Sequence, residues 1–153
     1  MIYHILILAN IVVLSLLVGG LFFVNMAVVP TFTALKASQY AEFHHVLDKY
    51  SDPLMPLLTF GTALLVLPEF LFAQPTWQVV SRLVGMSCVL GVALTSMLVH
   101  GPVNRRIRTW TVNTKLEDLD SMRTRWVAGH QFRTMLALLG LLALFLPVVF
   151  SFE

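Results

Sequence analysis

Four long apolar segments alternate with more polar stretches along this chain. The first covers 5–29 without a charged side chain, and the next two cover 54–73 and 79–99. A helix needs about 20 mostly apolar residues to cross a hydrocarbon layer of about 30 Å, and each of these segments is long enough. The fourth, 131–150, is apolar mainly in its later part, so we predict that its helix begins upstream, near Leu119.

The two longer polar stretches, 30–53 and 100–130, carry helical patterns of their own. The segment KASQYAEFHHVLDKY at 36–50 places apolar residues at helical spacing, which predicts an amphipathic helix at the membrane interface. Prolines lack an N–H and disrupt a helix interior. Pro30 is therefore expected to close the first span, and Pro102 to break or kink the end of the third.

The composition places this helical pattern in a membrane. The chain is 58% hydrophobic and 12% charged, whereas a soluble domain carries roughly a quarter charged residues. The first segment lacks the basic start of a signal peptide and exceeds its hydrophobic stretch of about 7–15 residues, so we expect it to be retained. We predict one all-α domain over 1–153, an integral membrane four-helix bundle with an amphipathic interfacial helix.

The basic residues indicate how the bundle lies in the membrane. Nine of the ten Lys and Arg residues fall in the connections 30–53 and 100–134. By the positive-inside rule these connections face the cytoplasm, and both termini lie outside the plasma (inner) membrane. The polar extension of the last span is then cytoplasmic. The same topology explains the run NRRIR at 104–108, so no nucleic-acid binding is expected.

Two charged residues and a stripe of small residues fall inside the predicted spans. Glu69 and Arg82 lie at nearly the same depth of an antiparallel hairpin, which predicts a structural salt bridge; a proton or ion path through Glu69 is the alternative. The stripe Ser87, Gly91 and Thr95 is typical of close helix packing, and contact between two copies of the chain is one form of it.

Most conventional active-site motifs are missing from the sequence. The single cysteine, Cys88, excludes an intrachain disulfide and any CxxC motif. The sequence also contains no nucleotide-binding or hydrolase signature. Candidate chemistry is therefore limited to polar residues near the predicted membrane boundary.

The histidines gather on one side of the predicted bundle. In RWVAGHQFR at 125–133, the side chains of Trp126, His130 and Arg133 share one helical face. Taken singly, this Trp is typical of an interfacial belt and this Arg of a side chain that reaches the headgroups. We expect most members of a larger set to line one pocket at the cytoplasmic end. That set is Asn25, His45, Asp48, His100, Asn104, His130 and Arg133.

Three segments carry a family resemblance. FHHVLDKY at 43–50, GPVNRRI at 101–107 and RWVAGHQFRTMLALLG at 125–140 resemble the small integral membrane proteins that include fungal anthrone oxygenases and many uncharacterised bacterial members. The resemblance covers nearly the whole chain. It implies a four-helix bundle that oxidises a polycyclic phenolic ketone with dioxygen, without a known organic cofactor. The fungal branch often has Asn at the position of His130, and this departure leaves substrate and mechanism open.

An anthrone- or quinol-type substrate needs a base and a group that stabilises an oxyanion. His130 is the expected general base, because imidazole accepts a proton near neutral pH. Asp48 can hold either His45, three residues away on one helix, or His44, four residues away; we expect it to orient His45, a second candidate base. The remaining expected roles are oxyanion stabilisation by Arg133 and Asn104, and substrate contact by Trp126, Asn25 and Arg105.

Two other functions use the same residues. In the first, His45, His100, His130 and Asp48 would be ligands of a haem or of a copper or iron centre. In the second, the chain is a non-enzymatic membrane subunit whose polar cluster closes one end of the bundle.

Overall fold

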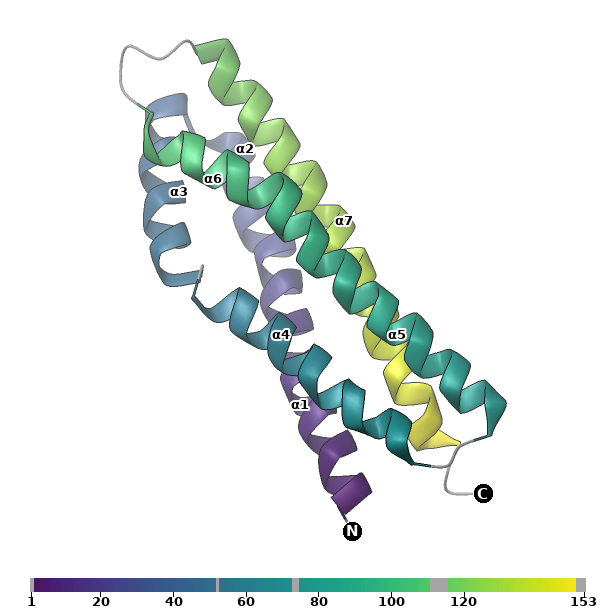
Figure 1. Cartoon of the computed structure of the whole chain (residues 1–153). Coiled ribbons are helices and arrows are strands. Elements are labelled where there is room, and N and C mark those ends of the chain that lie inside the picture. Colours follow the sequence, from purple (N-terminus) through teal and green to yellow (C-terminus); the bar gives the residue numbers. More distant parts are fainter. Residues whose placement is uncertain (1, 52, 73–74, 111–115, 151–153) are drawn as a thin grey trace.

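The computed structural model describes residues 2–51, 53–72, 75–110 and 116–150. The described residues are helical almost throughout and form four long antiparallel rods (Figure 1). Short π-helical and 3-10 segments lie within three of the rods. In chain order the elements are α1 (Ile2–Phe23), η1 (π, Val24–Val28), α2 (Val29–Ala34), α3 (Ala37–Ser51), α4 (Leu54–Val66), η2 (3-10, Leu67–Leu71), α5 (Thr76–Thr95), η3 (π, Ser96–His100), α6 (Gly101–Arg108) and α7 (Leu116–Val149).

Each rod is long and apolar enough to cross a membrane, so the chain is a multi-pass membrane protein. Within the described residues, the four candidate spans are Ile2–Ala34, Ala37–Leu71, Thr76–Arg108 and Glu117–Val149. No more than 33% of the most apolar part of any rod is buried inside the protein. Their outward faces are therefore apolar, which suits contact with lipid. The prediction of an all-α four-helix bundle is confirmed.

The first and third rods continue through their prolines, against expectation. Pro30 does not close the first span, because the helix runs on to Ala34. Pro102 does not break the third, which continues to Arg108; the kink expected as the alternative stays a prediction. Each proline follows a π-helical turn, in which the N–H groups donate to carbonyls five residues back; that of Gly101, for example, donates to Ser96. The wider turn accommodates a residue that lacks an N–H.

The helix predicted for 36–50 is present as α3. Its buried positions include Tyr40, His44 and Asp48, which follow one another at steps of four. This face packs against α6 and α7. In Figure 1, α3 leads downward into α4, so the two helices together form the second rod.

Close packing of α5 on α7 relies on glycines. A Cβ atom at Gly91 would lie 2.8 Å from Cδ1 of Leu136, and one at Gly140 would lie 3.2 Å from the Cβ of Cys88. The Gly91 part of the predicted small-residue stripe thus serves packing within the chain. Thr95 is buried and Ser87 is exposed, and contact between copies through this stripe stays a prediction.

The salt bridge predicted at the end that holds the N-terminus is confirmed. Arg82 Nε donates to Glu69 Oε2 at 3.2 Å, and both side chains are almost fully buried. Asn10 Nδ2 donates to the other carboxylate oxygen at 2.9 Å. The guanidinium also donates to the Tyr3 hydroxyl. This network joins three of the rods.

Candidate functional site

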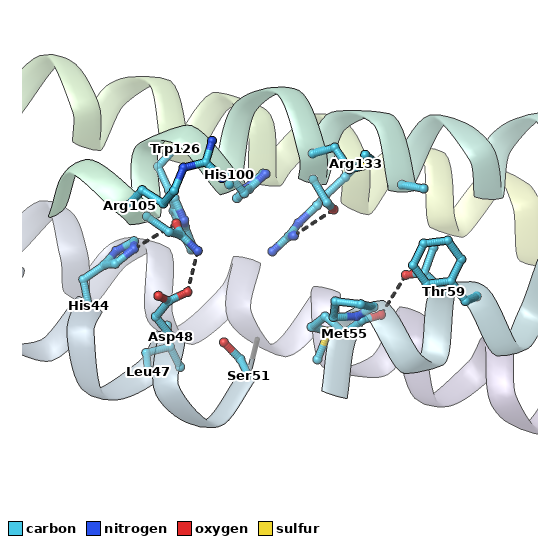
Figure 2. A pocket seen from close by; sticks show the side chains of 17 residues that line it. His44, Leu47, Asp48, Ser51, Met55, Thr59, His100, Arg105, Trp126 and Arg133 are labelled. Carbon is cyan, nitrogen blue, oxygen red and sulfur yellow. Dashed lines mark hydrogen bonds between the residues drawn. The ribbon is translucent and has the colours of Figure 1, made fainter. Parts of the chain in front are cut away.

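A cavity of about 470 Å³ lies between the second rod and the rods formed by α5–α6 and α7 (Figure 2). One part of its wall is apolar and includes Met55, Phe60 and Met97. The other part is polar and includes His100 and Arg133. The polar side chains come from α3, η3, α6 and α7, so every rod except the first contributes polar groups to the cavity wall.

The stripe predicted on α7 forms a compact stack. The rings of Trp126 and His130 are parallel to within 9°, with centroids 5.1 Å apart. Arg133, one turn further, donates to His130 Nδ1 from Nη2 at 2.9 Å. Its Nη1 donates to the hydroxyl of Ser96 at 3.2 Å. Figure 2 shows this guanidinium extending from α7 into the space between the rods.

Hydrogen bonds at both ring nitrogens fix the state of His130. Because a guanidinium only donates, Nδ1 of His130 must accept from Arg133. Nε2 therefore carries the hydrogen, which it donates to the carbonyl oxygen of Leu21 at 3.0 Å. His130 is fully buried, lies outside the set of cavity-lining residues, and has no lone pair free to accept a further proton.

His100 lies at the end of the π-helical turn and lines the cavity. Its Nδ1 is 3.4 Å from the carbonyl oxygen of Thr95, which makes Nδ1 the protonated nitrogen. Nε2 then carries the lone pair, and within the described part of the chain it has no hydrogen-bond partner. The indole N–H of Trp126 is also buried without a partner there. The two rings meet edge to face at 5.4 Å.

A second hydrogen-bond chain joins α3 to α6. His44 Nε2 lies 3.1 Å from Oδ1 of Asn104, which accepts its hydrogen. The amide nitrogen of Asn104 donates to Asp48 Oδ1, and Asp48 Oδ2 forms an ion pair with Arg108. Because the third rod continues through Pro102, Asn104 lies one turn beyond His100, and both line the cavity.

The structure corrects the expected role of His45 as a residue of the pocket and a second candidate base. Its side chain is exposed and does not line the cavity, whereas His44 is 1% exposed and does. One residue changes the direction of a side chain on an α-helix by about 100°, so only one of two adjacent histidines can face the bundle. Asp48 binds Asn104 and Arg108, which places it at the site without the expected pairing to His45. The spacing of four from Tyr40 through His44 to Asp48 was the signal that could have shown this.

The two remaining predicted contact residues differ in position. Arg105 lines the cavity with a largely exposed side chain. Asn25 is half-buried in η1 and is not among the lining residues. Sequence reasoning missed Ser96, which positions Arg133, and Thr59 on the apolar side. Their small hydroxyls within apolar segments gave no signal of a site.

The donor groups are not arranged for a metal ion. Among the residues that the structure describes, no group of three or more His, Cys, Asp or Glu side chains could hold one. Both nitrogens of His130 are engaged, and the guanidinium of Arg133 beside it would repel a cation. The ring centroids of His100 and His130 are 6.1 Å apart. The ligand set expected from His45, His100, His130 and Asp48 therefore does not fit a metal as the residues stand.

Comparison with known proteins identifies a family to which the chain is similar. The family described as anthrone oxygenase matches residues 43–143, which include the larger part of α3, the whole third rod and most of α7. No curated protein and no solved structure matches the chain. The matched region is well over half of the chain and contains the polar part of the cavity wall. The chain therefore belongs to the anthrone oxygenase family.

Proposed function

We propose that this protein oxidises a hydrophobic aromatic substrate of anthrone or quinol type with dioxygen in the cavity between its rods. The observation that carries the proposal is the cavity itself, which joins an apolar wall to a buried guanidinium, that of Arg133. A flat aromatic ketone matches both features: its ring system is apolar, and its oxygen becomes negative during the reaction. Membership of the anthrone oxygenase family supports the same reaction class.

The apolar side of the cavity offers a route from the bilayer. Phe60 on α4 and Met97 in η3 line the cavity, and these two apolar residues are 57% and 66% exposed. The cavity wall therefore reaches the surface where lipid would lie. A poorly soluble substrate can arrive sideways through this wall without crossing water.

The reaction is the conversion of an acidic methylene to a carbonyl. A base removes one methylene proton, and the resulting enolate gives an electron to dioxygen. Recombination at carbon and protonation yield a hydroperoxide. Loss of the second proton with cleavage of the O–O bond leaves the ketone and releases water. Carbon loses four electrons and dioxygen gains four.

Arg133 is the residue suited to the enolate. Its guanidinium is held by His130 and Ser96, so it is oriented before the negative charge develops. Trp126 also lines the cavity, where its indole can contact the substrate rings. Asn104 is held by His44 and Asp48, which makes it a fixed polar group near Arg105.

Oxygen uptake with an anthrone, measured on protein in lipid vesicles, tests the proposal. Replacement of Arg133 by Ala removes the oxyanion donor and is expected to lower turnover by about 100- to 1,000-fold. Arg125→Ala, an exposed position on the same helix, is the matched control and should leave turnover unchanged. Full turnover in Arg133→Ala would show that the proposed site is wrong.

Two further outcomes would assign a different function. Folded wild-type protein that consumes no oxygen with any anthrone or quinol would indicate a non-enzymatic membrane subunit. A visible absorption band, or one metal ion per chain in elemental analysis, would indicate the haem or metal alternative and a rearranged ligand set.

We also propose that the basic end of the bundle, and with it the polar part of the cavity, faces the cytoplasm, and that both termini lie outside the plasma (inner) membrane. In a Cys88→Ser background, a cysteine at Thr76 should react with a membrane-impermeant maleimide on intact cells. A cysteine at Glu42 should react only after permeabilisation. The reverse labelling would invert the topology.

A further inference from the structure

The buried imidazoles around the cavity differ in what their nitrogens do. His130 donates from Nε2 to Leu21 and accepts at Nδ1 from Arg133. At His100 the protonated nitrogen faces Thr95, and the lone pair on Nε2 meets no hydrogen-bond partner among the described residues.

We infer that Nε2 of His100 takes up the methylene proton of the substrate, and that His130, the base expected from sequence, is instead a positioning residue for Arg133. The inference rests on the proposed function and assigns its base. His100 and Arg133 line the same cavity, whereas His130 does not. The proton acceptor and the cation that binds the enolate are thereby provided by two different helices.

The lone pair on Nε2 of His100 is buried and has no hydrogen-bond partner among the described residues. The ring is 4% exposed, and an unpaired buried acceptor is unfavourable, so the site is one that a ligand can complete. Gly129 on α7 leaves room for the ring, because a Cβ there would lie 3.1 Å from Cε1 of His100. The π-helical turn sets the ring over the Thr95 carbonyl, which fixes the tautomer.

The step balances within the site. The methylene C–H bond breaks, an N–H bond forms at Nε2 of His100, and the electron pair stays on the substrate as an enolate. Its oxygen pairs with Arg133. After dioxygen has accepted an electron and bound at carbon, the imidazolium returns its proton to the peroxide oxygen. His100 is then neutral again and can remove the second proton.

Hydrogen exchange without oxygen isolates this step. Protein in vesicles is incubated anaerobically with an anthrone in D₂O, and deuterium incorporation at the methylene is followed by mass spectrometry against a protein-free blank. His100→Asn is expected to lower the protein-dependent exchange rate by about 100-fold or more. His130→Asn should retain most of it, because an amide can still accept from Arg133 and donate to Leu21.

A third variant tests the positioning role. His130→Leu removes both hydrogen bonds and should abolish oxygen turnover. His130→Asn should retain turnover, a difference that side-chain packing alone would not explain. His100→Gln serves if His100→Asn does not fold. The inference would be overturned if the folded His100 variant exchanged deuterium at the wild-type rate, or if His130→Asn lost as much exchange as the His100 variant. In either case, oxygen uptake by the wild-type protein would still uphold the proposed function. Wild-type protein with neither exchange nor uptake would refute the proposed function and this inference with it.

Discussion

Removal of the Glu69 carboxylate should strongly destabilise the end of the bundle that holds the N-terminus. The variant Glu69→Ala would leave the guanidinium of Arg82, which is 1% exposed, without its counter-charge. It would also remove the acceptor for Asn10. Loss of one partner of a buried ion pair typically costs about 3–5 kcal/mol, and we expect a decrease of this size in the free energy of unfolding.

The double variant separates the ion pair from general packing. In Glu69→Ala combined with Arg82→Met, no charge remains buried, and replacing both partners of such a pair is often close to neutral. The double variant should therefore be more stable than Glu69→Ala alone. The coupling free energy of the double-mutant cycle should be on the order of 1–3 kcal/mol, within the range for residues in contact.

Unfolding in mixed micelles of increasing SDS content, followed by tryptophan fluorescence, measures these free energies. Glu42→Ala, an exposed carboxylate on α3, is the matched control and should stay within about 0.5 kcal/mol of wild type. A cost below about 1 kcal/mol for Glu69→Ala, or a double variant equal to the sum of the singles, would refute the assignment of a coupled buried pair.

Two further predictions concern packing and the histidine pair. Gly140→Leu should destabilise the protein by about 1–3 kcal/mol or more, because a Cβ there already lies 3.2 Å from the Cβ of Cys88; the control is Gly19→Leu, where nothing lies within 4 Å. Unfolding in SDS measures both, and equal stability would contradict the close α5–α7 contact. His44→Ala should lower stability by about 1–3 kcal/mol and reduce oxygen uptake. His45→Ala, at the exposed neighbour, should change neither, and equal effects in the two variants would contradict the assigned helix face.

The sequence predicted the four rods because each contains an apolar segment long enough to cross a membrane. A proline within such a segment does not change that length. The Glu69–Arg82 pair followed from equal depth in a hairpin, since a buried charge in lipid needs a partner nearby. The prolines misled because their effect was judged from the α-helix alone. A π-helical turn restores hydrogen bonding around Pro30 and Pro102 at the expense of one extra residue.

The site was predicted less completely, for a geometric reason. Trp126, His130 and Arg133 share a stripe on one uninterrupted helix, so their spacing fixed their mutual positions. The choice between His44 and His45 depended on the rotation of α3 about its axis, which its packing on α6 sets. Which ring nitrogen of His130 and of His100 carries the hydrogen depended on contacts with the backbone carbonyls of Leu21 and Thr95, and a sequence carries no signal for those.

The π-helical turns at Val24–Val28 and Ser96–His100 divide the first and third rods each into two helical parts, which are rotated about the rod axis relative to each other. An extra residue in a turn rotates everything beyond it by about 100° relative to an uninterrupted α-helix. Deleting one residue from the second turn would swing His100 and Asn104 away from the cavity while leaving the lipid-facing pattern of α5 intact. A change in the length of this turn would therefore alter which side chains of α6 face the cavity without altering which side chains of α5 face lipid.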